Sequence, residues 1–351
     1  TQLYELLPEG YLPYLPGYYY LLMGIGYLGN IFNIWNHVWL TYLWVKTPVF
    51  ITDILITICI FKFSKLYMSG KNALSGAAFY YLHPAVIYTT SVWGQIDSLV
   101  TLAGLAGILY WLENKYLVSL LIFVSGSLVK IQTWSLVPLF IILSSIQLTL
   151  KRVIKYVAIL FSLILILFLP MLTDKGLIWN IRYFSQFPHQ YPYTSIYAYN
   201  LWAPLGFIIS DKQKLFYGIE YRHIGLLLLL LVTSLILLPV YKRKTINPEP
   251  LMFAAFLLFF AFAFFPTRIH SRYLIYTLGF FAPFVVKFPK LGLGLSILII
   301  ANLLLPYKSN SFSFLVTLLN QPAVILLFVL FGLILFVVSY KRYISFFSSR
   351  T

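Results

Sequence analysis

Three side chains that can carry positive charge lie within five residues, between two stretches that contain no charge. Arg268, His270 and Arg272 follow an apolar run at 251–265 and precede another at 274–286. A guanidinium at the edge of an apolar segment is costly unless it meets water, a carboxylate or a phosphate. Two guanidiniums four residues apart share one side of a helix and can grip one phosphate, with His270 as a third donor. The segment predicts an anion site; arginines that extend to lipid headgroups are the alternative.

Two further polar clusters interrupt apolar sequence in the first half of the chain. The motif WGQIDS supplies the ring of Trp93, the amide of Gln95 and the carboxylate of Asp97. Such groups at a membrane boundary are typical of a functional site, although aspartate and serine also cap helices. In the motif KIQT, Lys130 could bind a phosphate or extend harmlessly to the interface. The residues alone leave both alternatives open.

A fourth cluster combines aromatic rings with amide and imidazole groups between residues 187 and 202. His189, Asn200 and Trp202 belong to it. Rings that stack on a sugar and polar groups that bond its hydroxyls are typical of carbohydrate binding. Aromatic residues are equally typical of a membrane interface.

Composition determines which elements must position these clusters. The chain of 351 residues is 61% hydrophobic and only 10% charged, with a mean hydropathy of +0.87. These values lie far outside the usage of soluble domains and exclude that class. Apolar runs long enough for helices, without the alternation of a barrel, predict an all-α polytopic transmembrane helix bundle forming one domain over 1–351. About 11–12 spans are expected, near 16–34, 48–66, 74–91, 97–112, 116–130, 133–148, 153–171, 224–241, 251–266, 273–287, 291–305 and 322–340.

Basic residues predict the orientation of these spans. The net charge of +16 indicates anchoring of basic loops against membrane lipids and not nucleic-acid binding. If spans alternate from residue 48, one side, predicted to be cytosolic, receives Lys62, Lys65, Lys71, Lys115, Lys151, Arg152, Lys155, Lys242, Arg243, Lys244, Lys287, Lys290, Lys341 and Arg342. All four polar clusters and the loop 172–222 then lie on the outer side. Segment 16–34 does not fit, so we expect it to be re-entrant or the alternation to fail once near residue 46. The single Cys59 excludes a disulfide within the chain.

The order of these motifs resembles the GT-C superfamily of membrane glycosyltransferases. The chain is similar in particular to prokaryotic members of the mannosyltransferase type, and more distantly to the dolichyl-phosphate-glucose-dependent glucosyltransferases. The resemblance covers nearly the whole chain from about residue 10. It rests on Lys46-Thr47-Pro48, Thr52-Asp53, His83-Pro84-Ala85, Trp93-Gly94-Gln95-Ile96-Asp97-Ser98, Lys130-Ile131-Gln132, Asn200-Leu201-Trp202 and Arg268-Ile269-His270-Ser271-Arg272-Tyr273.

The resemblance implies inverting transfer of a hexose, mannose or glucose, from a polyprenyl- or dolichyl-phosphate donor to a hydroxyl of a glycan, lipid or protein acceptor. Arg268, His270, Arg272 and Lys130 would bind the lipid phosphate. Trp93, Gln95, His189, Asn200 and Trp202 would bind sugar or acceptor. Asp97 is a catalytic candidate; the base itself is expected upstream of Thr1, with Glu5 as a weaker alternative. The protein is expected in a prokaryotic cell membrane with its active site on the outer face.

One departure and several absences bear on this prediction. Ser271 stands where the family's arginine motif usually has glutamate, so no carboxylate role is assigned there. The sequence has no nucleotide-binding fingerprint, and its five histidines show no metal-ligand spacing, so no cofactor is expected. A divalent metal would need acids from a segment before Thr1. The alternative function is a transporter or flippase for an anionic lipid-linked or sugar substrate, which predicts pseudo-symmetric halves that the sequence does not show.

Overall fold

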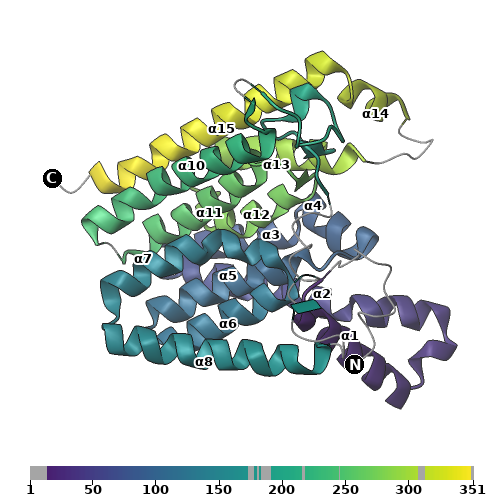
Figure 1. Ribbon diagram of the computed structural model, residues 1–351, viewed down its shortest axis with the longest axis vertical. Coiled ribbons are helices and arrows are strands. Elements are labelled where there is room, and N and C mark those ends of the chain that lie inside the picture. Colours follow the sequence, from purple (N-terminus) through teal and green to yellow (C-terminus); the bar gives the residue numbers. More distant parts are fainter. Residues whose placement is uncertain are drawn as a thin grey trace.

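The chain is built from helices, as its composition predicts. A computed structural model describes residues 14–172, 178–179, 182, 191–215, 218–244, 246–306 and 313–348. Figure 1 shows the longer helices lying side by side, with α10 and α15 at one edge and α8 at the other. The α-helices are α1 (Pro16–Ile31), α2 (Val38–Ser64), α3 (Gly70–Tyr81), α4 (Pro84–Ile87), α5 (Asp97–Leu112), α6 (Tyr116–Val129), α7 (Val137–Gln147), α8 (Leu150–Phe168), α10 (Tyr221–Arg243), α11 (Pro248–Phe264), α12 (Tyr276–Phe281), α13 (Pro289–Leu304), α14 (Ser313–Leu319) and α15 (Pro322–Ser348). The all-α prediction is confirmed.

Short irregular helices separate several of these elements and shorten them. A π-helix spans Tyr88–Trp93, and 3-10 turns lie at Ile34–Asn36, Ile131–Leu136, Leu169–Met171, Ala203–Leu205, Tyr273–Ile275 and Ala282–Phe284. Within the described residues, three helices are long and apolar enough to cross a membrane: α2, α10 and α15. Six of the other predicted spans are shorter apolar helices, near 97–112, 116–129, 131–147, 248–264, 273–284 and 289–304. A helix of 16 residues such as α5 rises only about 24 Å, which is less than the thickness of a bilayer's hydrocarbon core. The helices α7 and α12 are shorter still, and adjoining 3-10 turns lengthen them.

The first predicted span forms one arm of a helical hairpin. The chain leaves α1, turns at residues 32–37 and enters α2, and the two arms are joined where the indole of Trp44 donates to the carbonyl of Ile25 at 2.9 Å. Figure 1 shows this hairpin projecting beyond the other helices. The sequence places a boundary near residue 46, but α2 continues through Lys46 and Pro48 as one helix of 27 residues. The residues of α2 before Lys46 therefore belong to the same helix as those after it.

The core lies around α11, which is buried along nearly its whole length. It packs against α10, α12 and α15, and its phenylalanines interlock with rings of those helices, as Phe260 does with Phe336 at 5.5 Å between centroids. A second group of helices, α2, α5 and α6, packs through small residues. A Cβ at Gly126 would lie 2.2 Å from Cβ of Ala103. The close approach of α5 and α6 at this point therefore requires glycine.

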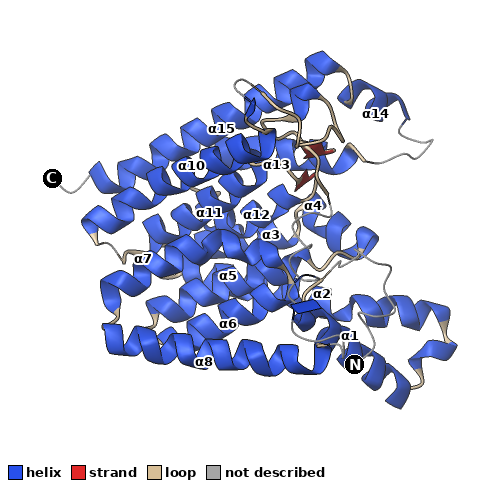
Figure 2. Ribbon diagram, viewed as in Figure 1, coloured by secondary structure: helices blue, strands red, loops and turns tan. Residues whose placement is uncertain are grey.

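Two loops distant in sequence are joined by the two described strands. β1 (Ser195–Ile196) pairs in parallel with β2 (Ile269–His270), with Ser195 opposite Ile269 and Ile196 opposite His270. Figure 2 shows these strands at one end of the bundle, opposite the ends of α10 and α15 that carry Lys242, Arg243, Lys341 and Arg342. The strand pair fixes the loop 191–215 beside the segment 266–272, which contains the arginine motif.

Candidate functional site

A buried carboxylate is the centre of the first polar site. The π-helix ends at Gly94, whose φ of +71° lies in the left-handed region that favours glycine, and the chain then turns into α5, where Asp97 is the first residue. Asp97 is 1% exposed. Its Oδ1 accepts hydrogen bonds from the ammonium of Lys130 at 2.5 Å and from the hydroxyl of Tyr276. Its Oδ2 lies 3.3 Å from Nε of Arg272.

The two cations reach Asp97 from different segments. Lys130 follows the last turn of α6 in an extended conformation and is 6% exposed. Arg272 comes from the turn after β2, and its guanidinium lies over the ring of Trp93 at 5.5 Å and over that of Tyr273 at 5.6 Å. Two cations around one carboxylate leave this group, called here the Asp97 cluster, with a surplus of one positive charge when all three are ionised.

Hydrogen-bond geometry leaves donor capacity in the Asp97 cluster. The contact between Arg272 and Asp97 is an ion pair without a well-aligned hydrogen bond, and Nε of Arg272 is buried with no hydrogen-bond partner among the described residues. Two acceptors, Oδ2 of Asp97 and Oε1 of Gln132, are also buried without a hydrogen-bond partner among the described residues, while Nε2 of Gln132 donates to the hydroxyl of Tyr273 at 2.8 Å. A buried guanidinium nitrogen without a partner is costly, so the site is suited to an acceptor group that completes it.

Burial changes the charge states near the cluster. It lowers the pKa of Lys130 to about 8, with the attraction of Asp97 opposing the shift and the repulsion of Arg272 adding to it. Burial, together with repulsion from Arg272 and Lys130, lowers the pKa of His270 to about 3. At neutral pH, Lys130 is therefore a cation and His270 is neutral. His270 lies between the rings of Tyr191 and Tyr273, at 4.9 and 5.1 Å, and can offer one N–H donor but no charge.

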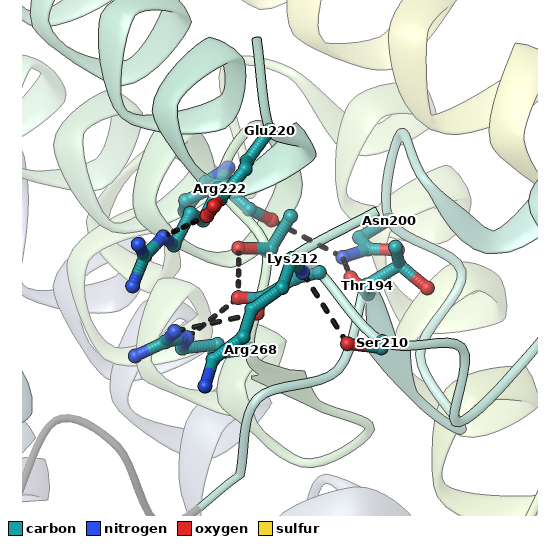
Figure 3. Close-up of polar contacts among 10 residues, drawn as sticks. Thr194, Asn200, Ser210, Lys212, Glu220, Arg222 and Arg268 are labelled. Carbon is teal, nitrogen blue, oxygen red and sulfur yellow. Dashed lines mark hydrogen bonds and ion pairs between the residues drawn. The ribbon is translucent and has the colours of Figure 1, made fainter. Parts of the chain in front are cut away.

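The two arginines of the motif do not converge on one point. The spacing suggests a shared side of a helix, but residues 269–270 form β2 and Arg268 has a φ of +66°. Nε of Arg268 lies 2.6 Å from Oδ2 of Asp211, a carboxylate that is completely buried. Figure 3 shows Arg268 and its dashed contacts, whereas the ion pair of Arg272 is with Asp97. The segment has no helical repeat: Arg268 is in the left-handed region, β2 covers only the next two residues, and Arg272 is in the right-handed helical region at φ −82°, so the two side chains join different clusters.

The predicted sugar-binding residues divide in the same way. Trp93 joins the Asp97 cluster by covering Arg272, and the half-buried Gln95 follows Gly94 beside it. Asn200 and Trp202 lie elsewhere and are committed to the backbone. Nδ2 of Asn200 donates to the carbonyls of Thr194 and Pro266, and the indole of Trp202 donates to the carbonyl of Phe265 at 2.8 Å. Both side chains hold the loop 191–215 against the residues that follow α11, and Figure 3 shows the amide of Asn200 beside Thr194. Glu5 and His189 lie outside the described residues.

Tyr276 has no signal in the sequence, because it occurs in an apolar run where a hydroxyl looks incidental, but it donates to Asp97. Tyr273 and Asp53 belong to motifs that carry the resemblance, but no role was predicted for either. Tyr273 accepts from Gln132, and the carboxylate of Asp53 on α2 accepts from Tyr80 at 3.0 Å and from Thr90 at 2.6 Å. A cavity of about 10 Å³ lies between Asp53 and Asp97, the size that admits one water. The buried hydroxyl of Ser98 lines it without a hydrogen-bond partner among the described residues.

No protein-family model matches the chain, and a search of curated proteins found no relative. The described residues contain no group of three or more histidine, cysteine, aspartate or glutamate side chains that could hold a metal ion. The chemistry of the site must therefore be argued from its own geometry.

Proposed function

We propose that the protein is an integral-membrane glycosyltransferase of the GT-C type that moves a hexose from a polyprenyl-phosphate donor to an acceptor hydroxyl by inversion. One observation carries this proposal: the Asp97 cluster is buried, has one surplus positive charge and keeps a guanidinium nitrogen without a hydrogen-bond partner among the described residues. The phosphate of such a donor, a diester before transfer and a monoester once the sugar has left, supplies the charge and the oxygen acceptors that complete such a site.

In the proposed reaction, the acceptor oxygen forms a bond to the anomeric carbon while the bond from that carbon to the phosphate oxygen breaks. The acceptor proton passes to a carboxylate base, and the electron pair of the broken bond leaves on the lipid phosphate. Lys130 and Arg272 stabilise the charge that develops there. Asp97 is a positioning residue in this scheme because its carboxylate is already bound by Lys130, Arg272 and Tyr276. No described residue is assigned as the base, and Glu5, which lies outside the described residues, is the candidate within the chain.

Other predicted residues take secondary roles in this proposal. Trp93 limits the movement of Arg272 by covering its guanidinium, and the half-buried Gln95 would bond a sugar hydroxyl. His270, neutral at ordinary pH, acts as a hydrogen-bonding group and not as a cation. Arg268 binds Asp211 and does not contact the same phosphate as Arg272.

The membrane arrangement is also part of the proposal. The chain would cross a prokaryotic cell membrane several times, with the Asp97 cluster near the outer surface. Support comes from the positions of charge: the basic ends of α10 and α15 lie at the end of the bundle opposite β1 and β2 (Figure 2). Positive residues favour the cytosolic side, so the strand end is assigned to the outside.

The proposal is tested with the full-length protein in liposomes that contain polyprenyl-phosphate mannose or polyprenyl-phosphate glucose. The lipid and glycoprotein fraction of host membranes serves as acceptor. We expect release of free polyprenyl phosphate and its loss in Arg272→Gln, because the leaving group loses a cation. Lys115→Gln is the matched control, since Lys115 forms an exposed ion pair with Glu113 far from the site. Movement of intact donor across the membrane without cleavage would instead establish the transporter alternative.

A further inference from the structure

A second group of charges lies beside the arginine motif and is separate from the Asp97 cluster. It consists of Lys212, Arg222 and Arg268 with the carboxylates Asp211 and Glu220, and is called here the Asp211 cluster. Arg268 binds Asp211 through Nε at 2.6 Å and Nη2 at 3.3 Å, and Nε of Arg222 lies 2.5 Å from Oε2 of Glu220. Figure 3 shows Arg222, Arg268 and Lys212 extending to the same side, away from Asn200.

Arg222 points over the bundle and not into lipid. It lies on the side of α10 that carries the buried residues Gly225, Ile236 and Val240, at helical spacings of 3, 14 and 18 residues. Gly225 touches the segment before Arg268: a Cβ there would lie 3.0 Å from the backbone nitrogen of Thr267. The exposed leucines of α10, such as Leu227 and Leu231, lie on the opposite side. Extension of Arg222 to surrounding headgroups therefore does not explain its position.

The Asp211 cluster has more positive than negative charge. Three cations and two carboxylates leave a surplus of one. Asp211 is completely buried, and Oδ2 also accepts from the hydroxyl of Thr267 at 3.1 Å, so its capacity is used within the protein. Lys212 is exposed and forms no ion pair with any described residue. A preformed group of guanidinium and ammonium donors with surplus charge is suited to an oxyanion.

The two basic clusters lie close enough to serve one reaction. Arg268 and Arg272 flank β2, and four residues of extended chain separate their Cα atoms by at most about 13 Å. His270 lies between them. We propose that Lys212, Arg222 and Arg268 form a second oxyanion site that takes a phosphate group, and that the phosphate belongs to the acceptor. The assignment to an acceptor rests on the proposed transferase function; the oxyanion site itself does not.

The test measures binding of radiolabelled geranyl phosphate to the full chain in detergent by equilibrium dialysis, without any turnover. Two equivalents are expected to bind. The double variant Lys212→Gln/Arg222→Gln should weaken one equivalent at least tenfold and leave the other unchanged. The double variant Lys130→Gln/Arg272→Gln should do the converse, so failure of the proposed donor site and failure of the second site are distinguishable.

The matched control is Lys242→Gln/Arg243→Gln, which removes the same residue types from the opposite end of α10 and should leave both equivalents unchanged. Lys212→Gln alone, an exposed change, repeats the measurement if the double variant does not fold. Binding of one equivalent in the unaltered protein, or undiminished binding in the Lys212→Gln/Arg222→Gln variant, overturns the proposal.

Two further arms identify the source of the phosphate. Glycerol 3-phosphate should displace the second equivalent while geraniol should not, because the site recognises charge and not the hydrocarbon tail. Displacement by geraniol would show that the site recognises the hydrocarbon tail and would refute the assignment. In nanodiscs, the second equivalent should bind equally with phosphatidylcholine and phosphatidylglycerol. Its loss in phosphatidylglycerol alone would assign the site to bulk lipid headgroups and overturn the acceptor assignment.

Discussion

Replacement of Asp97 by asparagine is expected to destabilise the protein more than loss of either cation. The substitution keeps the shape of the side chain but removes the charge that holds Lys130 and Arg272 together. Both cations then face each other in a buried site without a counter-ion. Lys130→Gln is milder, because Asp97 keeps Arg272 and the hydroxyl of Tyr276.

The magnitudes follow from burial. Removing one partner of a buried ion pair costs about 3–5 kcal/mol, and Asp97 is 1% exposed. Loss of one charged hydrogen bond from a carboxylate that keeps other partners costs about 1–3 kcal/mol, which applies to Lys130→Gln. The double variant Asp97→Asn/Lys130→Gln leaves a single cation, so its loss should be smaller than the sum of the two by about 2 kcal/mol.

Thermal unfolding in detergent measures these differences. For a chain of this size 1 kcal/mol corresponds to roughly 2 °C, so Asp97→Asn should lower the midpoint by about 6 °C or more and Lys130→Gln by less. The reasoning is refuted if Lys130→Gln is the more damaging change, or if the two losses are simply additive. Either result would mean that Asp97 is not the common counter-ion of the cluster.

Three other changes have defined outcomes. The affinity of the Asp97 cluster for geranyl phosphate should fall as pH rises through about 8, the pKa of Lys130, because the ammonium loses its proton. The variant Lys130→Arg keeps its charge, so its affinity, measured from pH 6.5 to 9.5, should not show that fall. Gly126→Leu should lower the unfolding midpoint by several degrees because a Cβ already meets Ala103, whereas Gly24→Ala, with no atom near its Cβ position, should not. Arg268→Met should lower the free energy of unfolding by about 3–5 kcal/mol, because it leaves Asp211 buried without its cation. In the double variant Arg268→Met/Asp211→Asn the buried charge is also removed, so the same unfolding assay should show a smaller loss.

Composition and apolar runs are sufficient to predict a helical protein and to locate most of its helices. They also predict that Trp93, Asp97 and Lys130 lie near Arg272, because alternating spans place all of these residues at the same end of the helix bundle. The length of the spans is less predictable. The sequence predicts one short span near 133–148, but a 3-10 turn at Ile131–Leu136 precedes α7, and only tertiary packing selects such a break.

The arginine motif was harder to predict for a different reason. A spacing of four residues indicates a shared helical side only if the segment is helical, and β2 is held by pairing with β1 from a distant loop. A strand of two residues has no periodicity to recognise. The partner of Arg268 could not be inferred either, because Asp211 occurs in a polar loop where a charge is ordinary. Tyr276 contacts Asp97 only through the packing of α12 on α5.

The ion pair between Asp97 and Lys130 has a consequence for the biogenesis of the protein. Asp97 begins α5 and Lys130 follows α6, so the pair closes the open end of a helical hairpin made of consecutive elements. When such a hairpin enters a bilayer as a unit, its leading end carries no net charge, and the electrostatic work of translocation is reduced. Arg272 is synthesised much later, so in the proposed membrane arrangement the surplus positive charge of the Asp97 cluster is added only after the hairpin has inserted.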